Sequence, residues 1–321
     1  AAALSAMTTS VYASKARILA LGDEVEDNYF VEDSRRIFTN AAQIHNYTNQ
    51  VFLEWGANGA TTGGVLDTDD TPKAMGGFLM ESGNLVYGAY VGNESNISSS
   101  LRILGTDLTK TSGQSLATAD NQLDLFVGGE ASSIKWGANF IYAKGEDKLS
   151  SGKKREDSAM AVKLGAMKDN WEGYANISIN SESERDNGYT STTADVKFDG
   201  KFGAQLGGSY KFDGGRQAFV SVKKFDWEHN SDTTKTDGGL MSYRVGYGKT
   251  FKATSDGSAF VRAYYERISL TLEKTGTQKA ELNRTRLPLD IGYEAKANSW
   301  LTLRGSVTHN VMGNVEGKNI S

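Results

Sequence analysis

The sequence predicts an all-β fold: a transmembrane antiparallel β-barrel of about fourteen strands, preceded by a short plug-like segment. Three observations predict it. Apolar residues recur at every second position along most of the chain. The connections between these segments alternate between short and long. No window approaches the ~18 consecutive apolar residues of a membrane-spanning helix, whereas a membrane-spanning strand needs only about 9–11 residues.

The composition agrees with β-structure and excludes several classes of protein. The chain has 321 residues, with 36 Gly, 14 Tyr, 13 Phe, 5 Trp, 2 Pro and no Cys. Aromatic and Thr-rich sequences favour strands, and the absence of Cys excludes a disulfide framework and a thiolate metal site. A net charge of −4, spread along the chain, offers no basic face, so we expect no nucleic-acid partner.

The N-terminus indicates an exported protein, and the predicted barrel layout places that protein in the bacterial outer membrane. Residues 1–13, AAALSAMTTSVYA, are small and apolar and end on a small residue, as the end of a secretory signal peptide does. We interpret them as a signal-peptide remnant, with an ordinary tail as the alternative. The rest divides into an N-terminal plug-like or periplasmic segment, 14–48, and the barrel, 49–321.

Thirteen segments alternate fully or in part and are the predicted strands. In order they are 49–57, 73–82, 84–93, 121–129, 133–143, 157–167, 171–180, 201–212, 216–227, 239–251, 258–272, 283–296 and 299–309. The eighth is a special case, because Asp199-Gly200 suits a hairpin turn. A turn there would invert the later order of short and long connections, so we predict one long strand, extending back to about 192, with a kink or bulge at the glycine.

The connections carry most of the topological information. The short ones are Ser82-Gly83, Glu130–Ser132, Lys168–Asn170, Asp213–Gly215, Ala253–Gly257 and Ala297-Asn298. The long ones are hydrophilic: 58–72, 94–120, 144–156, 181–191, 228–238 and 273–282. Outer-membrane barrels have this layout, with short turns in the periplasm and long loops outside, whereas soluble sandwiches mix connection lengths.

Alternation alone does not show whether the apolar face of the sheet points outward or inward. In 286–307, for example, Leu287, Leu289 and Ile291 alternate with Arg286 and Asp290. In a soluble protein the leucines face inward, and in a membrane barrel they face lipid while the charges face a wet lumen. The order of connections favours the barrel. A soluble exported β-protein such as a lectin is the alternative if that order is coincidental.

The tryptophans fall near predicted strand ends, where membrane barrels carry aromatic girdles. The predicted girdle residues are Trp55, Trp136, Trp171, Trp227 and Trp300. Bacterial single-chain barrels have an even number of strands. Because thirteen are visible and the chain ends at Ser321 in a predicted long loop, we expect a fourteenth, closing strand to be missing from this sequence. An odd barrel or a miscounted strand is the alternative.

Residues 14–48 do not alternate, and the stretch around 33–42 predicts a compact turn or short helix. Irregular backbone at membrane depth must be surrounded by protein. The pattern of Ser34, Ile37, Phe38, Asn40 and Ala42 resembles the N-terminal motif of long-chain fatty-acid-transporter-type outer-membrane proteins. That resemblance implies a fourteen-stranded barrel with an N-terminal plug, although an alanine stands where the family has a proline. In style the chain is also similar to porin-like major outer-membrane proteins.

With the leucine faces outward, eleven charged side chains point inward. On the lipid face an Arg or Lys near the midplane would cost about 2–4 kcal/mol. The predicted lumen-lining residues are Asp124, Lys135, Lys163, Glu172, Arg244, Arg262, Glu266, Arg286, Asp290, Glu294 and Arg304. Two interpretations stay open: these groups pair across the interior and seal it, or they line a pore and set its selectivity.

Nothing in the sequence points to catalysis or to a cofactor. His45, His229 and His309 lack a zinc-site spacing. Residues 248–250, Gly-Lys-Thr, lack the first glycine of a phosphate loop, and the acidic stretch 67–70 lacks the spacing of a calcium loop. We expect no enzyme activity, no metal and no cofactor.

The sequence therefore predicts passive, porin-like transport of small polar or amphipathic solutes, or of hydrophobic compounds as the family resemblance implies. The alternative is a non-conducting structural or interaction barrel that binds lipid or surface ligands. Expected partners are outer-membrane lipid, lipopolysaccharide and a small-molecule solute. No stretch of the sequence marks an oligomer contact.

Overall fold

The computed structural model describes residues 14–25, 27–56, 73–93, 122–187, 195–231, 234–274 and 279–320. The predicted signal-peptide remnant 1–13 lies outside these residues. So do the predicted loops 58–72, with its acidic stretch, and 94–120.

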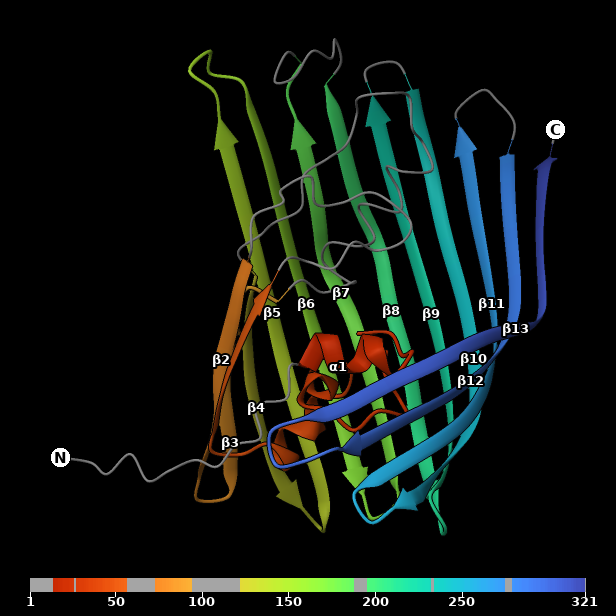
Figure 1. Ribbon diagram of the computed structural model, residues 1–321. Helices are drawn as coiled ribbons and strands as arrows, with labels where there is room; N and C mark the ends of the chain where they lie inside the picture. Colours follow the sequence, from red (N-terminus) through yellow and green to blue (C-terminus); the bar gives the residue numbers. More distant parts are fainter. Residues whose placement is uncertain are drawn as a thin grey trace.

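In the described part of the chain, thirteen strands form one antiparallel sheet in which neighbours along the chain are neighbours in space (Figure 1). This confirms the all-β fold and the predicted number and order of visible strands. The strands are β1 Gln50–Gly56, β2 Lys73–Ser82, β3 Leu85–Val91, β4 Leu123–Ala131, β5 Ile134–Lys148, β6 Lys154–Lys168, β7 Trp171–Arg185, β8 Val196–Phe212, β9 Arg216–Ser231, β10 Thr234–Thr254, β11 Gly257–Lys274, β12 Lys279–Lys296 and β13 Thr302–Ile320.

From β5 onward most strands are longer than predicted, chiefly at the end of the long connections. Strand residues make up most of the predicted loops 144–156, 228–238 and 273–282 and the part 181–185 of the loop 181–191, and β13 continues to Ile320 where a loop is predicted. The reason is that backbone pairing continues after the apolar face ends. Both faces are polar in the extensions of β5, β6, β7, β9 and β10 at the long connections, so the period-two signal disappears there although the hydrogen-bonded ladder does not.

The kink predicted at Asp199-Gly200 is present as a bulge. Strand β8 continues through this dipeptide without a turn, and its pairing with β9 shifts by one residue between Gly200 and Phe202. A bulge inserts one extra residue and so exchanges the faces of the residues beyond it.

The sheet has two edges, at β1 and β13. Among the described residues β1 pairs with β2 and β13 pairs with β12, and no pairing between the two edges is present. Closure of the sheet and the fourteenth strand therefore stay predictions.

The described part of the N-terminal segment, 14–48, folds as helix α1 (Ser14–Ala20) and two 3-10 helices, η1 (Ser34–Phe38) and η2 (Ala41–Asn46). Each 3-10 helix begins at a side-chain cap. Asp33 Oδ1 accepts from the Arg35 nitrogen at 3.1 Å, and Asn40 Oδ1 accepts from the Ala42 nitrogen at 3.0 Å. These helices are the compact structure predicted around 33–42.

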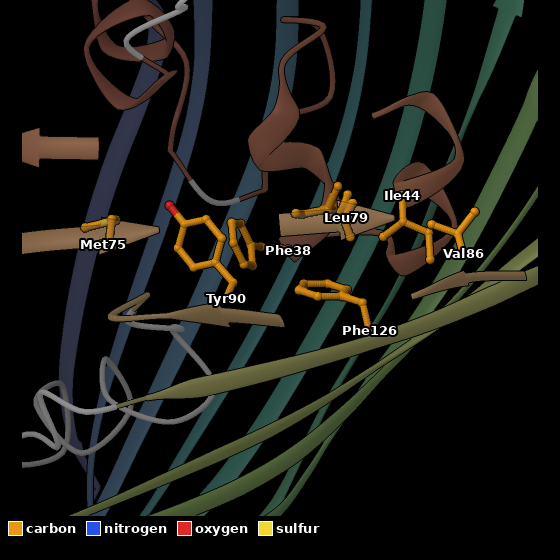
Figure 2. Close-up of a cluster of buried hydrophobic side chains, with 8 residues drawn as sticks. Phe38, Ile44, Met75, Leu79, Val86, Tyr90 and Phe126 are labelled. Carbon is orange, nitrogen blue, oxygen red and sulfur yellow. The ribbon is translucent and has the colours of Figure 1, made fainter. Parts of the chain in front are cut away.

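This segment lies inside the curl of the sheet, in the half near the short turns, with the middle strands behind it and β12 and β13 in front (Figure 1). Phe38 and Ile44 pack against an apolar patch of β2, β3 and β4 that includes Leu79, Tyr90 and Phe126 (Figure 2). The concave face of the sheet is therefore the interior of the protein.

Candidate functional site

The convex face of the sheet is apolar although it is exposed. On β10, for example, Tyr243, Val245 and Tyr247 are 45%, 53% and 50% exposed. Leu206 on β8 and Ile291 on β12 reach 58% and 56%. Soluble proteins rarely expose contiguous apolar surface over a whole sheet. This face needs an apolar surrounding.

The concave face is charged although it is buried. Lys163, Arg244, Arg262, Glu266 and Asp290 are all at most 4% exposed. Ionised groups are almost never buried to this degree without partners. The two faces together have the reverse of a soluble protein's polarity.

The convex apolar face is a band of limited height. On β8 it runs from Phe212 to Phe202, and outward-facing charges begin at Asp199 and Lys197. At about 3.3 Å per residue this is roughly 33 Å along the strand. With a tilt of about 40°, the height is about 25 Å, which matches the lipid-facing band of a transmembrane barrel.

Three acidic residues of the N-terminal segment, Asp23, Glu24 and Asp27, which we call the acidic stretch, lie along the inner face of β9–β12. Asp23 Oδ2 accepts from Arg262 Nη1 at 3.0 Å. Glu24 is paired with Arg244 at 3.2 Å and with Arg286 at 3.0 Å. Asp27 and Lys223 complete the series of ion pairs.

Burial and these cations act in opposite directions on the acidic stretch. Burial alone would raise the pKa of Glu24, but Arg244, Lys223 and Arg286 together hold it below its ordinary value. For Asp23, burial outweighs Arg262, and its pKa is raised. Glu24 is thus the carboxylate that the inner face stabilises in its ionised form.

A second anchor lies at the start of β7. The Glu172 carboxylate accepts hydrogen bonds from Arg36, Gln43 and Asn40 of the segment, the last at 3.2 Å. It also accepts one from Ser209 of β8 at 2.6 Å. Such a fully bonded carboxylate fixes the orientation of η1 and η2 over the sheet.

Two glycines allow η2 to approach the sheet closely. Gly137 of β5 and Gly165 of β6 are directly paired and both face inward. A Cβ at Gly165 would overlap Asn40 Oδ1 and lie 2.6 Å from the Ala42 nitrogen. A Cβ at Gly137 would likewise overlap the segment backbone. Only glycine fits where two backbones meet at this distance.

The segment also contacts both edges of the sheet. Arg35 pairs with Glu54 of β1 at 3.1 Å. Ser306 of β13 donates to the Ala20 carbonyl at 3.0 Å, and Arg17 pairs with Glu294 of β12 at 2.9 Å. A sheet whose first and last strands touch the same short segment is curled around it.

The structure places the predicted lumen-lining residues on the concave face, and most of them bind the segment or one another. Lys163 Nζ donates to the Phe38 carbonyl at 2.5 Å, and Asn139 donates to Asp124 at 2.8 Å. The remaining pairs are Arg262 with Asp290, Arg286 with Glu266, and Arg304 with Glu294. Lys135 lies at the start of β5, half-buried, opposite Glu130 and Met167.

One predicted girdle residue is placed differently. Trp227 is 1% exposed and packs with Phe198 and Phe225 on the concave face of β8 and β9. Its side chain points inward, as does that of Phe225 two residues earlier. Closeness to a strand end does not predict this, because both faces of β9 carry charged residues and the alternation does not show which face is the inner one. Trp136, Trp171 and Trp300 are exposed, the last in the turn before β13.

The side chain of Trp55 lies outside the described part of the chain. Contact of the exposed tryptophans with a membrane interface therefore stays a prediction.

The sequence interpretation missed the partners of the inward charges. No local pattern connects Asp23, Glu24 and Asp27 to their partners, which lie between 196 and 262 positions away in the chain. Their signal is charge asymmetry: the stretch 18–34 contains six acidic residues and no basic one. Such a block needs cations from elsewhere in the fold.

Within the described residues, no group of three or more His, Asp or Glu side chains is placed to hold a metal ion. Among those residues, too, no helix has the length and apolarity to cross a bilayer.

Comparisons with known proteins give only distant likenesses. No protein-family model and no curated protein matches the sequence. The structure is similar to a loop-deletion mutant of OmpT, an outer-membrane protein of Vibrio cholerae, with 15% identity, a TM-score of 0.36, and coverage of 84% of this chain and 92% of that one.

It is also similar to the trimer form of in-vitro folded OmpT, with 16% identity, a TM-score of 0.37, and coverage of 84% and 85%. The resemblance to the fatty-acid-transporter type finds no support in these comparisons. Likenesses this distant assign no function.

Proposed function

We propose that this chain is an outer-membrane β-barrel for passive transport of small polar or amphipathic solutes, with residues 14–48 held in its interior as a plug-like constriction. The observation that carries the proposal is the reversed polarity of the sheet: apolar side chains on the convex face and ion pairs on the concave face. Hydrocarbon outside and an aqueous interior are the surroundings that satisfy both faces.

The interior chemistry favours polar solutes. The half near the short turns is lined by charged and amide side chains, as described above. An apolar patch formed by Phe198, Phe225, Trp227 and Leu270 lies further toward the long connections. A solute that passes both regions would contact water, charge and aromatic surface in turn, which suits polar and amphipathic molecules.

One observation favours a second function, a non-conducting structural barrel. Most of the inward charges are engaged with the N-terminal segment, as a sealed interior would require. The two functions differ in whether the segment leaves a path for solute or can be displaced from it.

Conductance across planar bilayers, with a glycine variant, separates these functions. Gly165→Val places a side chain where η2 contacts the sheet and should push the segment away without changing any charge. We expect larger single-channel conductance from this variant than from the unmodified protein. Gly173→Val is the matched control, because a Cβ there has its nearest neighbour at 3.8 Å. The absence of channels from all three proteins would rule out transport.

A further inference from the structure

We infer that the inner face of β9–β12 is an anion-binding site for solutes that carry two or more carboxylates, and that the acidic stretch (Asp23, Glu24 and Asp27) occupies this site as an internal ligand. This inference deepens the proposed function by naming the charge class of a solute, and it rests on the same assignment of the concave face to the interior.

The site is a wall of cations on neighbouring inward rows of the sheet. Arg244 of β10 lies opposite Glu266 of β11, which lies opposite Arg286 of β12. Two positions further along the strands, Lys223 of β9 and Arg284 of β12 face inward on one row. Inward rows two residues apart are about 6.6 Å apart, so these groups lie within reach of one extended ligand.

Arg262 of β11 completes the wall on the other side of this group. It lies four residues from Glu266 and is paired with Asp290 across β11 and β12 at 3.0 Å. The wall therefore contains five cations and two carboxylates of its own. This leaves an excess of three positive charges, and the carboxylates of Asp23, Glu24 and Asp27 are paired with it.

The sheet itself holds the guanidinium groups in place. Arg262 lies over the ring of Phe260 at 4.7 Å. Arg244 lies over the ring of Tyr264 at 4.7 Å, and Arg286 lies over the same ring at 5.6 Å. Cation–π contacts and the ion pairs within the sheet do not involve the segment. The wall is therefore preorganised for an anion and would persist if the segment moved away.

The wall also has binding capacity that the segment leaves unused. Arg244 is 4% exposed, yet its Nε makes no hydrogen bond among the described residues. The carboxylate oxygen Glu266 Oε1 lies 3.6 Å from it, beyond hydrogen-bond distance. The Nε–H group of Arg244 is therefore a buried hydrogen-bond donor without an acceptor among the described residues. A carboxylate oxygen of a bound solute would be a suitable acceptor for it.

Calorimetric titration of citrate into the full-length protein in detergent tests this inference, with acetate as the single-carboxylate comparison. The variant Asp23→Asn, Glu24→Gln, Asp27→Asn removes the internal ligand's charge and leaves the wall intact. We expect it to bind citrate at least about tenfold more tightly than the unmodified protein, a typical size for coupling between two competing ligands. Acetate should show no such gain.

The matched control carries the same change of charge on the convex face: Glu184→Gln, Asp237→Asn, Glu273→Gln, all at exposed positions. Equal citrate affinity of the two triple variants would overturn the inference. Binding in detergent does not require conduction. If the protein forms channels in bilayers but the two triple variants do not differ in citrate binding, this inference is wrong and the proposed function still stands.

If the interior triple variant does not refold, hydrogen exchange on the unmodified protein decides. Citrate that competes for the wall should lower the amide protection of residues 21–31, and acetate at equal ionic strength should not. Unchanged protection in saturating citrate would overturn the inference.

Discussion

Replacing Val245 by Arg tests the sidedness of the sheet directly. Val245 lies in the middle of the convex face of β10, is 53% exposed, and has Tyr243 and Tyr247 on either side of it on the same face. If this face contacts hydrocarbon, the guanidinium must enter it. If it contacts water, the change is a surface substitution with no lost packing.

The two cases predict changes of very different size in the free energy of unfolding. An Arg at the midplane of the lipid face of a barrel costs about 2–4 kcal/mol, which is about a 30- to 1000-fold change in the folding equilibrium. A surface substitution in water usually changes the free energy of unfolding by no more than about 0.5 kcal/mol. Urea titration of the protein folded into lipid vesicles, followed by tryptophan fluorescence, measures the difference.

Thr271→Arg is the matched control. Thr271 faces outward on the neighbouring strand β11, but beyond Arg267, where the convex face has become polar. We expect it to change the free energy of unfolding by less than about 0.5 kcal/mol. If Val245→Arg is as harmless as Thr271→Arg, the convex face does not contact lipid and the assignment of the interior fails.

Three further predictions follow from the interior and its rim. Arg262→Met leaves the carboxylates of the wall and the segment buried without their cation, and should lower the free energy of unfolding in vesicles by about 3–5 kcal/mol, whereas Lys249→Met on the convex face should not. The Glu24 carboxylate, with its lowered pKa, contributes stability that is complete above its unfolded pKa of about 4.3 and is lost as pH falls through the folded value. Amide protection of the segment should therefore fall below that pH, and the fall should be smaller in Glu24→Gln. Brominated lipids should quench the fluorescence of a protein that retains only Trp136, and should leave one that retains only Trp227 unquenched; the reverse result would contradict the inward placement of the latter.

The strand number, the strand order and the bulge at Gly200 could be predicted from the sequence. These properties depend on neighbours in the chain: alternation reports the two faces of each strand, and a short turn forces the next strand to pair beside it. The inward parity of residues such as Arg244 and Arg262 follows from the same rule. Much of the candidate site's wall was therefore predictable, because each residue needed only its own strand.

The face that Trp227 occupies, the length of the strands and the partners of the inward charges were decided by tertiary structure. Strand extensions with two polar faces carry no alternation, so only the ladder with the next strand reveals them. The ion pair of Asp23 with Arg262 joins residues 239 positions apart, and no local pattern encodes such a distance. The sequence determined a sheet with one apolar and one charged face. Only the curl of that sheet brought the charged face around the acidic segment, because burying those charges required partners from both ends of the chain.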